Sequence, residues 1–273
     1  MTYKKFGSIG GGVMAEALLS RLIFREIYSA RDVLVGEPSP GRRDFLREKY
    51  AVEVTGDNKE VLAEVGEAIL LAVKPQVFPQ VAAELRDLDL AGDRKPLVIS
   101  ILAGVPLSKL EAAFGDWPVV RVMPNTPATV GAGISAIAPG KYVTPSCMEV
   151  AKAVLQAVGD VVEVPESMMD AVTGLSGSGP GYVAVFIEAL SDGGVRAGLP
   201  RAIAYQLALQ TVLGTAVLLQ ESGMHPAVLK DKVTSPGGTT IAGIAELESS
   251  AFRSASIEAV VAARDRSREL GGG

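Results

Sequence analysis

The feature that most constrains the fold is a change of sequence pattern near residue 164. Before it, short apolar runs alternate with amphipathic helical stretches, and after Pro165 the strand signal stops. The run Ala68–Val73 is apolar throughout, as expected for a strand that is buried on both faces. Alternating strands and helices favour a doubly wound sheet with parallel strands in its first half. We therefore predict an α/β domain over residues 1–164, followed by an all-α domain over residues 165–273.

The expected elements follow the apolar runs and their Gly and Pro boundaries. Strands are expected over residues 5–9, 33–36, 52–54, 68–73, 96–101, 119–123, 133–138 and 161–164. Helices of the first domain are expected over residues 12–25, 39–49, 75–85, 108–114 and 145–158. Helices of the second domain are expected over residues 168–174, 181–197, 200–221, 226–232, 238–247 and 253–269.

The second domain contains an unusually apolar stretch. Residues 171–220 carry only four charged side chains, whereas 21% of the whole chain is charged. A helix that is apolar on every side must be buried on every side, and a domain of about 110 residues has a limited interior. Burial inside one chain and burial against another subunit are both open. We favour the second and predict a homodimer with these helices at its centre.

The composition excludes several kinds of chemistry. One Cys and one His cannot form an internal disulfide or a thiolate zinc site, and they argue against a His-rich metal centre or a Ser-His-Asp triad, so no metal is expected. A net charge of −5 offers no general attraction for nucleic acid. The apolar stretch 182–199 is interrupted by Glu188, Asp192 and Arg196. We therefore expect no membrane span, no nucleic-acid partner and a cytoplasmic location.

A glycine motif links the first strand to a cofactor. Residues Gly10–Ala15 fit the pattern G-x-G-x-x-A, follow a predicted strand and open a predicted helix. In such a turn the first glycine, Gly10, permits the tight bend, the second, Gly12, lets the backbone approach a pyrophosphate, and Ala15 allows close helix–strand packing. Free N–H groups and the helix dipole then attract phosphate. We therefore predict a Rossmann-type dinucleotide site.

The end of the second strand bears on the choice between NAD and NADP. Glu37 stands where an acidic side chain would bind a ribose 2′-hydroxyl, which favours NAD. Ser39, Arg42 and Arg43 would instead suit a 2′-phosphate. A third interpretation is that Ser39 caps a helix and the arginines are solvated. The residues at this strand end leave the choice open.

Two further loops follow predicted strands. Lys74, in Ala72–Pro75, either approaches the nicotinamide side or lies as a solvated lysine with a buried stem. Asn125 and Thr126 follow the strand 119–123 on a loop stiffened by proline. They either line the expected cleft or merely close a turn.

Two glycine-rich segments interrupt the helical domain. Gly174–Gly181 contains four glycines, which indicates a close backbone approach, a sharp bend or a plain helix–helix turn. Thr234–Thr240 precedes a helix, and Gly237 and Gly238 leave N–H groups exposed there. A carboxylate would fit this helix start, while the alternative is ordinary capping by Ser235.

Taken together, these stretches resemble the pyrroline-5-carboxylate reductases. The matching segments run in family order over essentially the whole chain: Gly7–Gly12, Ala72–Pro75, Met123–Pro127, Asp170–Pro180, Asp192–Val195 and Ser235–Ile241. The resemblance implies reduction of the cyclic imine 1-pyrroline-5-carboxylate to L-proline with NAD(P)H. It also implies an N-terminal dinucleotide-binding domain and a helical dimerisation domain, with dimers in some members forming larger rings.

The resemblance also implies site residues. The cofactor contacts expected from the motif and the family together are Ile9, Gly10, Gly11, Gly12, Val13, Met14, Glu37, Ser39, Asn58, Ala72, Val73, Lys74, Pro75, Ala103 and Asn125. The expected substrate contacts are Ser235, Gly237, Gly238, Thr239 and Thr240. We hypothesise that this helix start binds the substrate carboxylate and that the Thr240 hydroxyl hydrogen-bonds the ring nitrogen, which makes Thr240 the expected catalytic residue.

Two other functions fit the same two-domain plan. A 3-hydroxyacid-type dehydrogenase would need a Lys or His acid/base in the helical domain, where residues 171–229 offer only His225. A non-enzymatic nicotinamide-binding protein would need no anion-binding helix start. For the main hypothesis we expect NADP(H) in preference to NAD(H), a small imino-acid substrate, and self-association as a homodimer or a ring of dimers.

Overall fold

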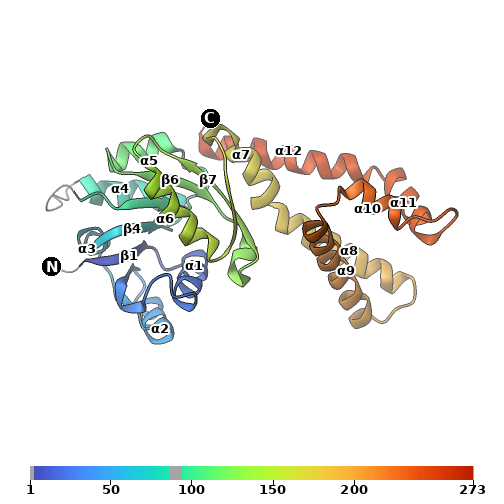
Figure 1. Ribbon diagram of the computed structural model, residues 1–273, viewed down its shortest axis with the longest axis horizontal. Helices are drawn as coiled ribbons and strands as arrows, with labels where there is room; N and C mark the ends of the chain where they lie inside the picture. Colours follow the sequence, from blue (N-terminus) through green and yellow to red (C-terminus); the bar gives the residue numbers. More distant parts are fainter. Residues whose placement is uncertain (1–2, 87–93, 273) are drawn as a thin grey trace. The chain divides into compact units, whose positions relative to one another are not determined.

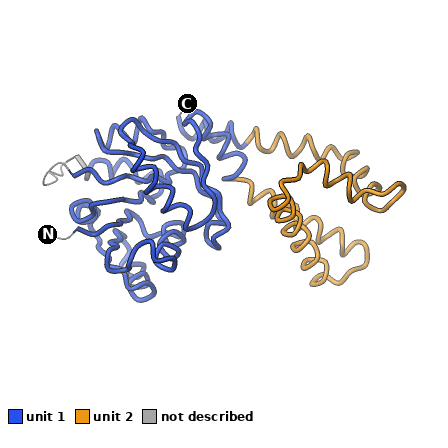
Figure 2. Tube along the Cα trace, viewed as in Figure 1, with its two compact units in different colours: residues 1–177, 263–273 blue, residues 178–262 orange. Residues whose placement is uncertain are grey.

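A computed structural model describes residues 3–86 and 94–272 (Figure 1). Its contacts form two compact units, which Figure 2 colours separately: residues 1–177 with 263–273, and residues 178–262. The expected boundary after residue 164 marks the end of the sheet, whereas the contacts keep residues 165–177 with it. One reason is the Arg121–Glu166 ion pair, whose nitrogen and oxygen lie 2.9 Å apart.

The first unit is built on one eight-stranded sheet. Its strands are β1 (Lys4–Ile9), β2 (Val33–Gly36), β3 (Glu53–Thr55), β4 (Val65–Leu71), β5 (Leu97–Ser100), β6 (Val119–Met123), β7 (Gly133–Pro139) and β8 (Gly159–Glu163). The order is β3-β2-β1-β4-β5-β6-β7-β8. Neighbours are parallel except β6 and β7, which are antiparallel. The predicted α/β class and the parallel first half are confirmed.

Helices cover both faces of this sheet (Figure 1). One apolar cluster joins a sheet face to α1 (Val13–Phe24), α2 (Pro40–Tyr50) and α6 (Pro145–Gln156). The other cluster joins the opposite face to α3 (Asn58–Glu64), α4 (Phe78–Arg86) and α5 (Leu107–Phe114). Strand side chains alternate between the two clusters, which is the period that a sheet buried on both faces requires.

The strand order reverses direction between β1 and β4. The chain leaves β1 toward β2 on one side and later enters β4 on the other side. Crevices that bind ligands in open α/β sheets lie at such a switch point, at the carboxyl ends of the strands. The loops that follow β1 and β4 therefore frame the expected cofactor cleft.

Helix α3 was not expected from the sequence. It has only seven residues, and its start is fixed locally by Asp57, whose side chain accepts the N–H of Lys59 at 2.9 Å. A helix this short shows too little periodicity to be detected. Strand β4 begins at Val65, earlier than the predicted residue 68.

The rest of the chain is helical, as predicted. Its elements are η4 (Glu166–Met168), α7 (Met169–Val172), a π turn (Thr173–Gly177), α8 (Gly179–Arg196), α9 (Arg201–Ser222), α10 (Pro226–Lys232), α11 (Thr239–Ser249) and α12 (Phe252–Gly271). The connecting turns of the sheet unit are η1 (Ala30–Asp32), η2 (Pro75–Val77) and η3 (Thr126–Val130).

The glycine-rich segment after residue 173 forms a π turn that leads into α8. A Cβ on Gly177 would lie 2.7 Å from Met123 Cε, so this glycine permits the close approach that was one of the predicted explanations.

Helix α9 departs from the expectation of no membrane span. It is the one helix among the described residues that is long and apolar enough to cross a membrane by length and composition. The charged stretch 182–199, on which that expectation rests, lies mostly on α8. Only 11% of the apolar window of α9 is buried within the chain. Such a helix must find cover outside its own chain.

Candidate active site

The turn after β1 is held by contacts that only glycine permits. Gly10 has φ +100°, and a Cβ there would lie 2.6 Å from the carbonyl oxygen of Ala72. Its N–H donates to the carbonyl oxygen of Gly36 at 2.8 Å, and its own carbonyl oxygen accepts the Ser8 hydroxyl at 2.7 Å. The turn is thus fixed against the ends of β2 and β4.

The start of α1 is open. Gly12 is exposed, and a Cβ added there would meet nothing within 4 Å. It occupies the N-cap position without a side-chain cap, and the first bond into the helix runs from the Glu16 N–H to the Gly12 carbonyl oxygen at 2.9 Å. The first N–H groups of the helix therefore face outward with the positive end of the helix dipole. This cradle fits a pyrophosphate.

A pocket of about 330 Å³ opens at the carboxyl ends of β4, β5 and β6. Its lining residues are Met14, Ala72, Val73, Lys74, Pro75, Ile101, Ala103, Met123 and Pro124. Six of the predicted cofactor contacts thus share one pocket. Ile9 is fully buried at the end of β1, and Val13 is 75% exposed at the start of α1.

Sequence reasoning did not single out Ile101, Met123 or Pro124 as site residues. All three follow or end a strand that points to the pocket, so the rule on strand carboxyl ends could have found them. Asn125 lies next to this lining rather than in it. Its side-chain oxygen accepts the Ile134 N–H at 3.0 Å, which closes the turn after β6.

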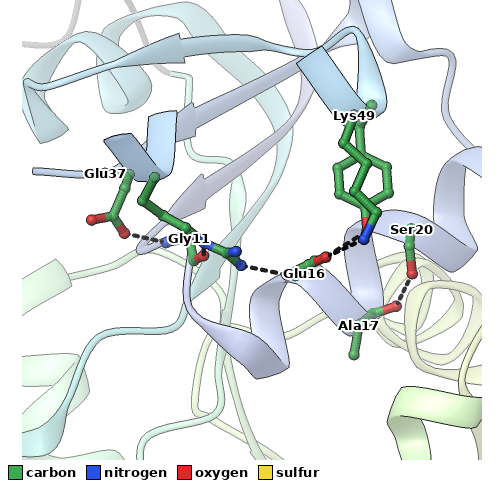
Figure 3. A network of polar contacts seen from close by, with 8 residues as sticks. Gly11, Glu16, Ala17, Ser20, Glu37 and Lys49 are labelled. Carbon is green, nitrogen blue, oxygen red and sulfur yellow. Dashed lines mark hydrogen bonds and ion pairs between the residues drawn. The ribbon is translucent and has the colours of Figure 1, made fainter. Parts of the chain in front are cut away.

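Glu37 stands at the end of β2 and faces the glycine turn (Figure 3). One carboxylate oxygen accepts the N–H of Gly11 at 3.0 Å, and the other accepts the N–H of Ser39 at 3.0 Å. Ser39 is the N-cap of α2, but its side chain makes no capping bond. The carboxylate of Glu37 therefore ties the residue that precedes α2 to the glycine turn.

Both neighbouring arginines are engaged by the protein. Arg42 Nε donates to the Gly11 carbonyl oxygen at 2.7 Å, and its terminal nitrogen lies 2.5 Å from Glu16 Oε2. Arg43 Nη1 donates to the carbonyl oxygens of Glu37 at 2.7 Å and Pro38 at 2.8 Å. The interpretation of these arginines as merely solvated does not describe them.

Glu16 is the centre of this polar network (Figure 3). Besides Arg42 it accepts Lys49 Nζ at 2.9 Å and the Tyr50 hydroxyl at 2.7 Å. Burial alone would raise the pKa of Glu16, but hydrogen bonds from Tyr50, Arg42 and Lys49 outweigh it and lower the pKa from 4.5 to about 2. Glu16 is therefore ionised at neutral pH, and it ties α1 to α2.

Asn58 begins α3 beside the end of β2. Its amide nitrogen donates to Glu84 Oε2 at 2.9 Å, and its oxygen lies 3.0 Å from where a Cβ on Gly36 would be. Among the described residues, no group of three or more His, Cys, Asp or Glu side chains is placed to hold a metal ion.

The predicted substrate residues lie in the second unit, at the start of α11. The N–H of Gly238 donates to the Ser235 carbonyl oxygen at 3.0 Å, and Gly237 has φ +65°. With Pro236 at the second position, this is the pattern of a type II turn. Gly238 is the N-cap and no side chain caps the helix, so Ser235 does not act as an ordinary cap.

The turn leaves the helix start accessible. Gly237, Thr239 and Thr240 are exposed, and a Cβ on Gly237 would meet nothing within 4 Å. A Cβ on Gly238 would lie 2.3 Å from Ser235 Oγ, so a larger residue there would displace that hydroxyl. The arrangement offers backbone N–H groups, a helix dipole and hydroxyls to an anion.

Comparisons with known proteins agree along the whole chain. A family model described as pyrroline-5-carboxylate reductase dimerisation matches residues 166–270, and one described as NADP oxidoreductase coenzyme F420-dependent matches residues 5–104. A pyrroline-5-carboxylate reductase of Synechocystis is 61% identical, with 98% of each chain covered.

Solved structures show the same likeness. The structure of a pyrroline-5-carboxylate reductase from Coxiella burnetii has a TM-score of 0.91 at 36% identity, with 99% of each chain covered. A Plasmodium falciparum pyrroline carboxylate reductase with NADP bound has a TM-score of 0.84 at 31% identity, again with 99% of each chain covered. Identity at this level over the full length places the chain in one family of enzymes. The chain belongs to the pyrroline-5-carboxylate reductases.

Proposed function

We propose that this chain performs the reaction of its family with two sets of residues, a cofactor set on the sheet unit and a substrate set at the start of α11. The reaction is the reduction of 1-pyrroline-5-carboxylate to L-proline with NAD(P)H, the last step of proline biosynthesis. Membership of this family sets aside a hydroxyacid dehydrogenase and a non-enzymatic nicotinamide-binding protein.

The observation that carries the cofactor assignment is the pocket beside the glycine turn. The open start of α1 offers N–H groups to a pyrophosphate, and the pocket lined by Met14, Ala72 and Ala103 offers an apolar surface to a flat ring. Lys74 adds a positive charge at the rim. When bound, the nicotinamide supplies the hydride that adds to the imine carbon.

The substrate set is assigned to the type II turn and the first turn of α11. Gly237 and Gly238 expose backbone N–H groups at a helix N-terminus, where a carboxylate is stabilised. Ser235 and Thr239 add hydroxyls on the same segment. These groups bind and orient an anionic imine without a charged side chain, which fits a chain with one histidine.

Thr240 is assigned the catalytic contact. Its exposed hydroxyl on the first turn of α11 hydrogen-bonds the ring nitrogen. When hydride adds to the imine carbon, the electron pair of the C=N bond moves to this nitrogen, and a proton from solvent reaches the nitrogen through the hydroxyl, which is thereby restored. Orientation of the imine carbon supplies most of the remaining rate enhancement, because hydride transfer depends on close and aligned approach.

We also propose the assembly and the location. The dimerisation family model covers α8 and α9, whose exposed side chains include Val185, Leu207 and Leu213. A homodimer that covers these residues explains the apolar α9 better than a membrane does, because the family model that includes this helix is described as a dimerisation domain. Rings of dimers and a cytoplasmic location belong to the same proposal.

The function is tested with purified protein, pyrroline-5-carboxylate and each reduced nicotinamide. We expect oxidation of the nicotinamide with the imine and none with 3-hydroxyacids or their oxo forms. Absence of turnover with the imine would reject the assignment. In the same assay Thr240→Ala should lower kcat by about 10²-fold, the size typical of a lost acid/base contact, with unchanged nicotinamide affinity.

Thr240→Ser is the matched control for this position. Serine keeps the hydroxyl and should restore most of the kcat, whereas valine keeps the shape and should not. If alanine, valine and serine variants all turn over like the wild type, Thr240 has no catalytic contact.

A further inference from the structure

The backbone donors at the end of β2 are already satisfied by a carboxylate of the protein. Glu37 takes the Gly11 N–H with one oxygen and the Ser39 N–H with the other, both at 3.0 Å. In folds of this class the adenosine ribose of a dinucleotide lies beside the end of the second strand, which Glu37 follows directly. An anion is thus built into this position by the chain itself.

The cationic side chains near Glu37 are bound to other groups of the protein. Arg42 spans the Gly11 carbonyl oxygen at 2.7 Å and Glu16 at 2.5 Å, and its guanidinium carbon lies 4.8 Å above the Phe45 ring. Lys49 also pairs with Glu16, at 2.9 Å (Figure 3). The network therefore holds two of the three nearby cations against one carboxylate.

Arg43 is held in a different way. One terminal nitrogen bridges the carbonyl oxygens of Glu37 and Pro38, at 2.7 and 2.8 Å. A guanidinium in this geometry fixes the backbone that carries the Glu37 side chain. Turning it toward a phosphate would break both bonds.

We propose that Glu37 makes this enzyme prefer NADH to NADPH, an inference that rests on the proposed function for the placement of the ribose at the end of β2. The carboxylate accepts hydrogen bonds from a ribose 2′-hydroxyl without rearrangement. A 2′-phosphate at the same place meets the Glu37 carboxylate, finds the Gly11 and Ser39 N–H groups taken, and finds Arg42 and Arg43 engaged. An NADH preference differs from the NADP(H) expected from the sequence.

Like charges at one contact act on specificity more than on overall affinity. The 2′-phosphate is the only difference between the two cofactors, so Glu37 must act on the ratio of their affinities. In a purely structural role Glu37 would only hold the glycine turn at Gly11, and its loss would weaken the binding of both cofactors alike. The ratio therefore separates the two roles.

The test measures binding of nucleotide fragments to the full-length protein without any imine. AMP and adenosine 2′,5′-bisphosphate, which differ only in the 2′-phosphate, are titrated by calorimetry, followed by NADH and NADPH. We expect the wild type to bind AMP and NADH at least about tenfold more tightly than their 2′-phosphorylated counterparts, the effect of one or two charged contacts. Equal affinities, or tighter binding of the 2′-phosphates, would overturn the proposal.

Three variants sharpen the comparison. Glu37→Gln removes the charge and Glu37→Ser also opens space, and both should shift the NADPH/NADH affinity ratio toward NADPH by about tenfold or more. Glu48→Gln, an exposed glutamate on α2, makes the same charge change and should leave the ratio unchanged. If the ratio does not move in either Glu37 variant and both cofactors bind equally more weakly, Glu37 only holds the glycine turn and the proposal is wrong.

A second arm tests where the phosphate binds once the carboxylate is gone. In the double variant Glu37→Ser with Arg43→Ala, the shift of the affinity ratio toward NADPH should be smaller than in Glu37→Ser alone, because Arg43 is no longer present to bind the 2′-phosphate. Failure of the enzyme to reduce the imine would not affect these binding data. The specificity of Glu37 and the proposed reaction can therefore fail separately.

Discussion

Gly177 lies against Met123, because a Cβ on the glycine would come within 2.7 Å of the methionine Cε atom. Gly177 ends the π turn, and Met123 ends β6 and lines the pocket that we propose for the cofactor. Single π turns inside helices are frequent at functional sites. Here the turn brings a residue without a side chain against a wall of the pocket.

Replacement of Gly177 by alanine should therefore change the pocket more than the stability. The obstructing atom is the end of a flexible side chain, so we expect Met123 to shift and the free energy of unfolding to change by about 1 kcal/mol or less. The KM for the reduced nicotinamide should rise about two- to tenfold, and steady-state kinetics measures it. Met123→Ala in the same chain should relieve the effect; a KM that stays high in the double variant would mean that the two residues are not coupled.

Gly10 and Gly12 offer a matched pair of glycine substitutions. Alanine at Gly10 would combine φ +100° with a Cβ only 2.6 Å from a backbone oxygen, so we expect a loss of about 1–3 kcal/mol in stability and a loss of dinucleotide binding. Alanine at Gly12 meets no atom within 4 Å and should leave the melting temperature unchanged. It should still weaken binding, because its Cβ projects into the phosphate cradle. Thermal melting measures the stability of each variant, and calorimetry measures its dinucleotide affinity. An equal fall in melting temperature in both variants would contradict the prediction.

The sheet and the phosphate turn were predictable because their causes are local. The buried residues 68–71 of β4 must be apolar, and a turn that needs positive φ at Gly10 needs glycine in the sequence. The short helix α3 escaped prediction because one capping contact at Asp57 decides it.

The roles around Glu37 could not be predicted from spacing. From residue types alone, either cofactor is compatible with Glu37, Arg42 and Arg43. Their effect on cofactor preference depends on which group each side chain binds. Two of these groups, Gly11 and Glu16, lie in a segment far away in the sequence. The role of Ser235 could not be predicted from spacing either. The sequence is compatible with Ser235 as the N-cap of the helix, but the type II turn puts Gly238 at the N-cap position.

Glu16 should make the free energy of unfolding depend on pH in the acidic range. Its pKa lies at about 2 in the folded chain, below the ordinary 4.5. A depressed carboxylate pKa stabilises the fold above pH 4.5, and this contribution is lost as the pH falls from 4.5 toward 2. We expect Glu16→Gln to be less stable than the wild type at pH 7, with the difference shrinking through that window. Urea unfolding at pH 7, 4.5 and 3, at one protein concentration, measures it.

Glu48→Gln is the control for this effect, since Glu48 is exposed on α2. Its stability difference from the wild type should stay near zero at all three pH values. A Glu16→Gln difference that is the same at pH 7 and pH 3 would mean that the ion pairs with Arg42 and Lys49 do not stabilise the fold.

The exposed leucines of α9 should report on self-association. Leu213 is 54% exposed in the single chain, and Phe24, on α1 of the sheet unit, is 78% exposed. In a symmetric dimer each substitution occurs twice. Burial of two leucines contributes about 3–6 kcal/mol, so Leu213→Glu should weaken the dimer by at least about 100-fold, whereas Phe24→Glu should not change it. Sedimentation velocity without detergent measures both. If Leu213→Glu sediments as the wild type does, this part of α9 is not an interface. A wild-type protein that stays in solution only with detergent would indicate a membrane contact instead.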